Sequence, residues 1–325
     1  MEKSLRKDAN INSGLILGFS LITLIIGQFV IRAVYNYYGV PTDNPSISPD
    51  ENRAIIISNI IYNLIKYIVF LPLLVVIARA LKQGGENSLR KSFCKPKVGA
   101  GKIVKWMFIS FFVIYAVSIL STMLFMAIEK AFGVSLRSAD LNTDGSAFGG
   151  IAVTIMTVIM APILEEILFR GVLLRNLEKY GGYLAVIYSG VMFGLWHTNY
   201  SQLFFTIAGG LCFSFMMVKT GSIFPSMILH LCLNFFGNFV SLFPDGSPED
   251  SGFNPVFMYL ILTVIVIIGF ILFVITLIKS RDDFKLENNC KELTTSRKFI
   301  GLWLAPLTIA AVAVFIGLTI YNALR

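Results

Sequence analysis

The sequence predicts an all-α protein, a polytopic transmembrane bundle of about nine helices whose N-terminus is cytoplasmic. Only 14% of its 325 residues are charged and 56% are hydrophobic, whereas soluble domains hold about 25% charged residues. The mean hydropathy is +0.75. Long apolar runs alternate with short polar loops, and because lipid offers backbone groups no hydrogen-bond partners, such runs form helices.

Nine apolar segments follow one another along the chain, and each is interpreted as one helix. They are residues 13–34, 54–78, 103–128, 149–174, 183–197, 200–218, 222–243, 255–278 and 299–324. A crossing needs about 20 apolar residues, so the ends of the short fifth segment are the least defined. The first segment resembles a signal peptide, but no small-residue cleavage site follows it, and an uncleaved helix is expected.

Three regions are expected from this order. Residues 1–148 hold three N-terminal helices, residues 149–243 hold a core with all the motifs described below, and residues 244–325 hold two C-terminal helices. No soluble domain or low-complexity segment interrupts them.

The basic residues predict the orientation. They gather in the N-terminal tail, in the loop between the second and third segments and in the last loop, residues 279–298. The alternate loops carry mainly acids. By the positive-inside rule the N-terminus is cytoplasmic and the C-terminus lies outside. The net charge of +8 therefore reflects topology; the expected partner is the lipid bilayer, with no nucleic acid.

Three charged residues interrupt the fourth segment, in the stretch APILEEILFRG: Glu165, Glu166 and Arg170. Charges within a bilayer cost several kcal/mol and are usually hidden inside the bundle and functional. At about 100° per residue, Glu166 and Arg170 share one face and are spaced for an ion pair, whereas Glu165 points about 100° away as the freer carboxylate. Pro162, one turn earlier, could bend this helix.

The only two histidines, His197 and His230, also fall in or at the ends of apolar segments, and Asn234 follows His230 by one turn. Counting about 1.5 Å per residue from the predicted cytoplasmic ends places Glu165 about 14 Å deep, His197 about 21 Å, His230 about 12 Å and Asn234 about 18 Å. We therefore expect one site towards the cytoplasmic half of the membrane. A structural polar cluster between helices is the alternative.

This set of side chains favours amide hydrolysis. A carboxylate and a histidine can activate water, and a second histidine with an asparagine can stabilise an oxyanion. No GxSxG or HExxH motif is present, so serine and zincin chemistry lack their signatures. A zinc or other divalent metal on Glu165, His197 and His230 is possible, but asparagine is a poor zinc ligand, and catalysis without a cofactor is slightly favoured.

Other polar or reactive residues receive no catalytic role. The cysteines have no CxxC or disulfide-like spacing and are interpreted as structural or incidental; they are Cys94, Cys212, Cys232 and Cys290. Lys66, amid apolar residues of the second segment, could pair with an internal acid or line a cavity.

Three motifs in order resemble one known family. EEILFR has the form EExxxR, FGLWH the form FxxxH and HLCLN the form HxxxN. Together they resemble the CPBP family of CAAX prenyl protease 2-like intramembrane endopeptidases and bacteriocin-processing or immunity proteins, also called Abi. The resemblance covers about residues 149–243. It implies that Glu165 activates water with help from His197.

The same resemblance assigns the remaining motif residues. It implies that Glu166 and Arg170 support the site, and that His230 and Asn234 stabilise the tetrahedral intermediate. Eukaryotic relatives remove the last three residues of prenylated proteins, whereas bacterial relatives are linked to peptide maturation, bacteriocin self-immunity and surface-protein regulation.

Three functions are compared. The leading one is an intramembrane endopeptidase of a bacterial cell membrane that cuts a membrane-associated peptide or protein, at a site entered from the cytoplasmic side. The alternative is a non-enzymatic bacteriocin immunity or membrane regulatory protein. A proton-coupled transporter ranks third, because the two halves show no inverted-repeat pattern.

Overall fold

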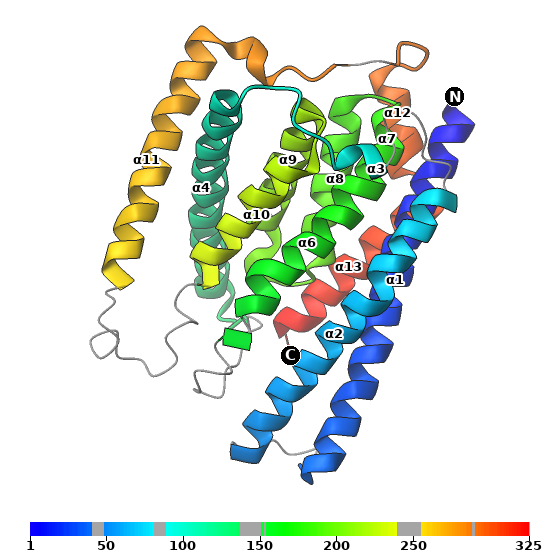
Figure 1. Cartoon of the computed structure of the whole chain (residues 1–325), viewed down its shortest axis with the longest axis vertical. Helices are drawn as coiled ribbons and strands as arrows, with labels where there is room; N and C mark the ends of the chain where they lie inside the picture. The colour runs from blue at the N-terminus through cyan, green and yellow to red at the C-terminus, as the bar shows by residue number, and fades with distance from the viewer. Residues whose placement is uncertain are drawn as a thin grey trace.

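The computed structural model describes residues 1–40, 49–80, 89–136, 151–152, 154–238, 255–287 and 290–324. Within these ranges every regular element is helical, which confirms the predicted all-α bundle. Figure 1 shows the long helices side by side, with the N-terminus at one end of the bundle. The boundaries expected near residues 148 and 243 lie outside the described residues.

Each predicted segment corresponds to a helix or to consecutive helical elements. The long helices are α1 (Glu2–Tyr38), α2 (Pro49–Ala80), α4 (Ala100–Phe132), α9 (Tyr200–Thr220), α11 (Pro255–Lys279) and α13 (Pro306–Leu324). Two are shorter, α8 (Gly182–Trp196) and α10 (Ile223–Asn238), and α3 (Leu89–Ser92) and η5 (Arg281–Phe284) lie in connections. Five helices among the described residues are long and apolar enough to cross a membrane by length and composition.

The prediction of one helix over residues 299–324 is wrong. The chain forms a short helix, α12 (Thr295–Trp303), and then α13 from Pro306. Proline lacks an N–H and its ring disfavours helical backbone in the residue before it. The helix is interrupted at Pro306 for this reason, whereas α2 continues through Pro72. The separate α12 packs on the N-terminal turns of α1, where Gly301 faces the Leu5 side chain.

The fourth segment is not a regular α-helix. A π-helical segment, η2 (Ile155–Met160), leads into α6 (Ala161–Glu166), and a second, η3 (Ile167–Leu174), leads into α7 (Arg175–Glu178). Pro162 stands in the first turn of α6, and the N–H of Ala161 bonds five residues back to the Met156 carbonyl. Because Pro162 has no N–H, the α-helical ladder is interrupted there. The diacid therefore sits between two widened turns, a feature common at functional sites.

Glycines bring α8 and α9 into close contact. A Cβ on Gly210 would lie 2.7 Å from the Gly190 carbonyl oxygen, and one on Gly194 would lie 2.7 Å from the Ile207 backbone nitrogen. Small residues at such a crossing let the helix backbones approach each other closely in a membrane. This packing holds the C-terminal end of α8, and with it His197, against α9.

We expect Gly194→Ala to destabilise the protein by about 1–3 kcal/mol, because the backbone of α9 cannot move away from the added methyl group. Gly317→Ala in α13 is the matched control, since a Cβ there meets nothing within 4 Å. Both changes share the gain in helix propensity. Thermal unfolding of the two purified variants measures the difference, and equal melting temperatures would contradict the close crossing.

Most of the described lysine and arginine side chains lie at one end of the bundle, which we call the basic end. Contacts tie it together: Asp8 pairs with Lys179, and Asp283 pairs with Lys105. The hydrogen bond from the Lys105 ammonium holds the pKa of Asp283 below its usual range. We call the opposite end the far end. It contains the turn between α8 and α9 and the C-terminal ends of α10 and α13 (Figure 1).

Candidate active site

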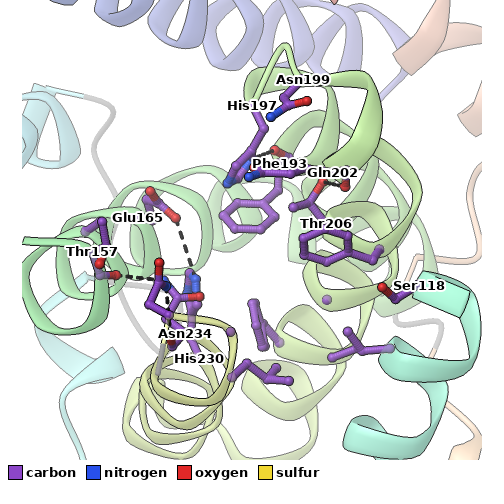
Figure 2. A pocket seen from close by; sticks show the side chains of 18 of the residues that line it. Ser118, Thr157, Glu165, Phe193, His197, Asn199, Gln202, Thr206, His230 and Asn234 are labelled. Carbon is purple, nitrogen blue, oxygen red and sulfur yellow. Dashed lines mark hydrogen bonds and ion pairs between the residues drawn. The ribbon is translucent and has the colours of Figure 1, made fainter. Parts of the chain in front are cut away.

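A cavity of about 1020 Å³ lies between α4, α6, α8, α9 and α10. Its lining includes Glu165, His197, His230 and Asn234, so the three sequence motifs meet in one place. Figure 2 shows these side chains around the cavity, with Phe193 between the two histidines. The predicted convergence of an acid, two imidazoles and an amide is therefore confirmed.

The predicted ion pair between Glu166 and Arg170 is also confirmed. Arg170 Nη1 lies 3.1 Å from Glu166 Oε1, and neither side chain has any exposed surface. Arg170 Nη2 donates to the Gly210 carbonyl at 3.1 Å. The guanidinium also lies 4.5 Å from the Phe193 ring centroid and 5.0 Å from that of Phe213. Close approach of α9 and cation–π contacts thus offset part of the cost of burying this charge.

His230 lies between the two acids. Its Nδ1 is 3.1 Å from Glu166 Oε1, and its Nε2 is 3.7 Å from Glu165 Oε2. The Phe213 ring stacks on the imidazole with centroids 4.5 Å apart. Glu166 consequently has His230 as a partner besides Arg170, where the sequence suggested only Arg170. Glu165 stays outside the ion pair and lines the cavity, as its helical position predicts.

Phe193, the first residue of the FxxxH motif, positions His197, the last residue of that motif. His197 Nδ1 is 2.8 Å from the Phe193 carbonyl oxygen. A carbonyl only accepts, so Nδ1 carries the hydrogen and Nε2 of the neutral ring keeps its lone pair. The Phe193 ring packs edge-on against His197, with centroids 4.7 Å apart, and also lies over Arg170. The sequence analysis gave Phe193 no role, although its place in the motif was a signal.

His197 is followed by a strained residue. Thr198 has φ of 48°, the only positive value for a non-glycine residue in the described chain. This conformation is unfavourable for a β-branched side chain. The Thr198 carbonyl accepts a hydrogen bond from Asn322 Nδ2 at 2.9 Å. The tight α8–α9 turn holds His197 at the end of α8, and α13 supports the turn from the side.

Asn234 is tied to the widened turn of η2. Its Nδ2 donates to the Thr157 carbonyl at 2.8 Å. A side-chain amide nitrogen has two hydrogens, so one remains for a second acceptor. Asn234 can therefore serve as the oxyanion donor that the sequence suggested only through this second N–H. Thr157 is a supporting residue that the sequence analysis did not identify.

Lys66 approaches this group from α2. Its Nζ lies 5.7 Å from the centroid of the Trp196 ring. The contact described for Lys66 is therefore an aromatic ring, and the suggestion that Lys66 pairs with an internal acid stays a prediction. The four cysteines are free thiols, in keeping with their expected incidental role.

The alternative of a metal on Glu165, His197 and His230 requires three donors around one centre. In the part of the chain that the structure describes, no three His, Cys, Asp or Glu side chains are grouped closely enough to hold an ion. His230 directs Nδ1 to Glu166, and His197 directs Nδ1 to a backbone carbonyl. The nitrogen that remains on each ring is Nε2, and His230 Nε2 lies 3.7 Å from Glu165 Oε2. All three residues line the same cavity, so the metal alternative is left to the chelator experiment described below.

The site does not lie in the half of the bundle nearer the basic end, which the sequence analysis expected to be cytoplasmic. The helix that carries Glu165 runs on to Glu178, beyond the predicted end at Leu174. The cavity lining continues to Asn199, Asn238 and Asn322, and all three lie at the far end. Helix length was misjudged because Arg175 and Glu178 were counted as loop residues, whereas they pair with each other within α7. The cavity therefore extends away from the basic end, contrary to the expected cytoplasmic entry.

Comparisons with known proteins agree with the motifs. Residues 147–236 match the family model described as type II CAAX prenyl endopeptidase Rce1-like. The chain is 28% identical over 178 residues to a Bacillus subtilis (strain 168) protein named "Putative membrane peptidase YdiL", covering 54% of this chain and 70% of that protein. No solved structure matches the chain. The matched region holds every residue of the three motifs.

Proposed function

We propose that this chain, whose residues 147–236 match the type II CAAX prenyl endopeptidase Rce1-like model, is a member of the CPBP family and an intramembrane endopeptidase that hydrolyses a peptide bond of a membrane-associated protein or peptide. The observation that carries the proposal is the shared cavity of Glu165, His197, His230 and Asn234. We place the protein in a bacterial cell membrane, in view of its similarity to the Bacillus subtilis protein.

In the proposed reaction Glu165 removes a proton from a water molecule, and the water oxygen attacks the carbonyl carbon of the substrate. Glu165 suits this task because it lines the cavity and is free of the Glu166–Arg170 ion pair. His197 accepts a hydrogen bond from the same water through its Nε2 lone pair, which the bond from Nδ1 to the Phe193 carbonyl leaves available. Two positioned acceptors orient the water for attack.

The oxyanion of the tetrahedral intermediate is stabilised by His230 and Asn234. Glu166 holds the His230 ring at Nδ1. His230 Nε2, which lies 3.7 Å from Glu165 Oε2, faces the place where the oxyanion forms and donates to it. The free N–H of Asn234 supplies a second donor. Donors held in place before the reaction stabilise the developing charge without reorganisation. The carbon–nitrogen bond then breaks, and the leaving amine takes the proton held by Glu165.

The proposal is tested by finding what the protein cuts. Membranes of cells that express the wild type or Glu165→Gln are compared by mass spectrometry of labelled protein N-termini. We expect at least one new N-terminus only with the wild type. A quenched peptide spanning that cut is then offered to both proteins in liposomes, and to His197→Ala, which we expect to cleave more slowly. Identical termini and equal turnover would favour the non-enzymatic immunity or regulatory function.

A chelator added to the wild-type liposome assay tests catalysis without a cofactor. We expect the cleavage rate to be unchanged, because the described side chains provide a base and oxyanion donors. A loss of activity that added Zn²⁺ restores would instead assign Glu165, His197 and His230 to a metal.

A further inference from the structure

The cavity has an uncharged polar rim at the far end of the bundle. Asn199 and Gln202 come from the start of α9, Asn238 from the end of α10 and Asn322 from the end of α13. Figure 2 shows Asn199 and Gln202 on the opposite side of the cavity from Glu165. Apart from Glu165 and the two histidines, no titratable acid or base is among the described lining residues except two tyrosines, Tyr115 and Tyr200.

The described lining of the cavity does not reach the basic end. All lining residues come from Glu165 or from positions nearer the far end on their helices, and the fully buried Glu166–Arg170 pair is not among them. On the basic-end side of Glu165, η3, α8 and α9 carry side chains with no exposed surface: Phe169, Leu173, Tyr188, Met216 and Met217. The described approach to Glu165 therefore comes from the far end.

The distribution of lysine and arginine between the two ends of the bundle predicts which compartment each end faces. The described basic end includes Lys97 just before α4, Lys102 and Lys105 in the first turns of α4, Lys279 at the end of α11 and Arg281 after it. Among the described residues, the far end holds Arg32, Arg53 and Lys130. The positive-inside rule assigns the basic end to the cytoplasm, which places the rim on the non-cytoplasmic side.

We propose that the substrate segment enters from the non-cytoplasmic side and is bound at the rim as an extended, uncharged peptide. This inference rests on the proposed endopeptidase function. Side-chain amides both donate and accept hydrogen bonds, as peptide groups do. Asn199 Oδ1, Asn238 Nδ2 and Asn322 Nδ2 already bond within the chain, so the Gln202 amide and the remaining amide atoms of the three asparagines are the groups that can meet a peptide backbone. The described residues of the rim offer no charged partner to a substrate side chain, and burying an unpaired charge beside them is costly.

Cysteine labelling in intact cells tests the direction of entry without any proteolysis assay. Gln202→Cys and Asn322→Cys are made singly in a chain whose four native cysteines are replaced by serine. Lys102→Cys, whose native side chain is 59% exposed at the basic end, is the matched control. A membrane-impermeant sulfonated maleimide is applied before and after permeabilisation. Thermal unfolding confirms that each variant is folded.

We expect both rim cysteines to be labelled in intact cells, and the cysteine at position 102 only after permeabilisation. The reverse pattern would overturn the proposal, as would rim cysteines that stay unlabelled under both conditions. Because labelling needs no substrate, this outcome is independent of whether the protein is a protease. With the quenched peptide in hand, a bulky maleimide on Gln202→Cys should also slow cleavage at least tenfold relative to the unlabelled variant; unchanged cleavage would overturn the role of the rim.

Discussion

Glu165→Gln should lower the cleavage rate by about 10²–10⁴-fold, the range that removal of a general base typically costs. Glutamine has the shape of glutamate but cannot take a proton from water. Glu165 takes no part in the buried ion pair, so the fold should be unaffected. The rate is measured with the quenched peptide in liposomes, at equal amounts of folded protein.

Glu129→Gln is the matched control for this change. Glu129 lies at the far end of α4, where its Oε1 accepts a hydrogen bond from the Leu136 backbone N–H, and it is not a lining residue of the cavity. We expect this variant to cleave at the wild-type rate. A Glu165→Gln protein with nearly wild-type turnover would show that another group, with His197 the first candidate, activates the water.

Glu166→Gln should destabilise the folded protein by about 3–5 kcal/mol, the usual cost of leaving one partner of a buried ion pair without its counter-charge. Arg170 would keep its charge in a position with no solvent exposure. The aromatic contacts of Phe193 and Phe213 do not replace a carboxylate. The change also removes the carboxylate that faces His230 Nδ1, so the activity of the remaining folded protein should fall as well.

A double-mutant cycle separates these effects. Arg170→Met alone leaves the Glu166 carboxylate buried without its counter-charge. Glu166→Gln combined with Arg170→Met removes both charges of the pair. We expect the double variant to be more stable than the sum of the single changes predicts, as measured by thermal unfolding. Additive losses would contradict the ion pair. Equal inactivity of Glu166→Gln and Glu165→Gln, with both stably folded, would contradict the division of labour between the two acids.

Much of the site could be predicted because it depends on local spacing. The helical period alone separates Glu165 from the Glu166–Arg170 face, and the structure has the same arrangement. The same period relates His230 to Asn234. The i,i+4 spacing within FxxxH also explains how the Phe193 carbonyl reaches His197. These relations lie within single helices, so they follow from residue order.

The errors arose where helices meet or end. The sequence did not reveal that Pro306 separates α12 from α13, or that the helix carrying the diacid extends to Glu178. It also did not reveal the second partner of Glu166, because His230 stands on another helix. Helix ends and contacts between helices depend on tertiary packing, which hydropathy along the chain does not record.

The sequence by itself determined the class of the protein, its membrane segments and the chemical groups of the site. Apolar length, basic loops and three spaced motifs are properties of residue order, and lipid restricts such segments to helices. Only the tertiary structure decided where the cavity opens. Its direction depends on which helix ends meet at Asn199, Asn238 and Asn322. That meeting arises from contacts between residues far apart in the chain.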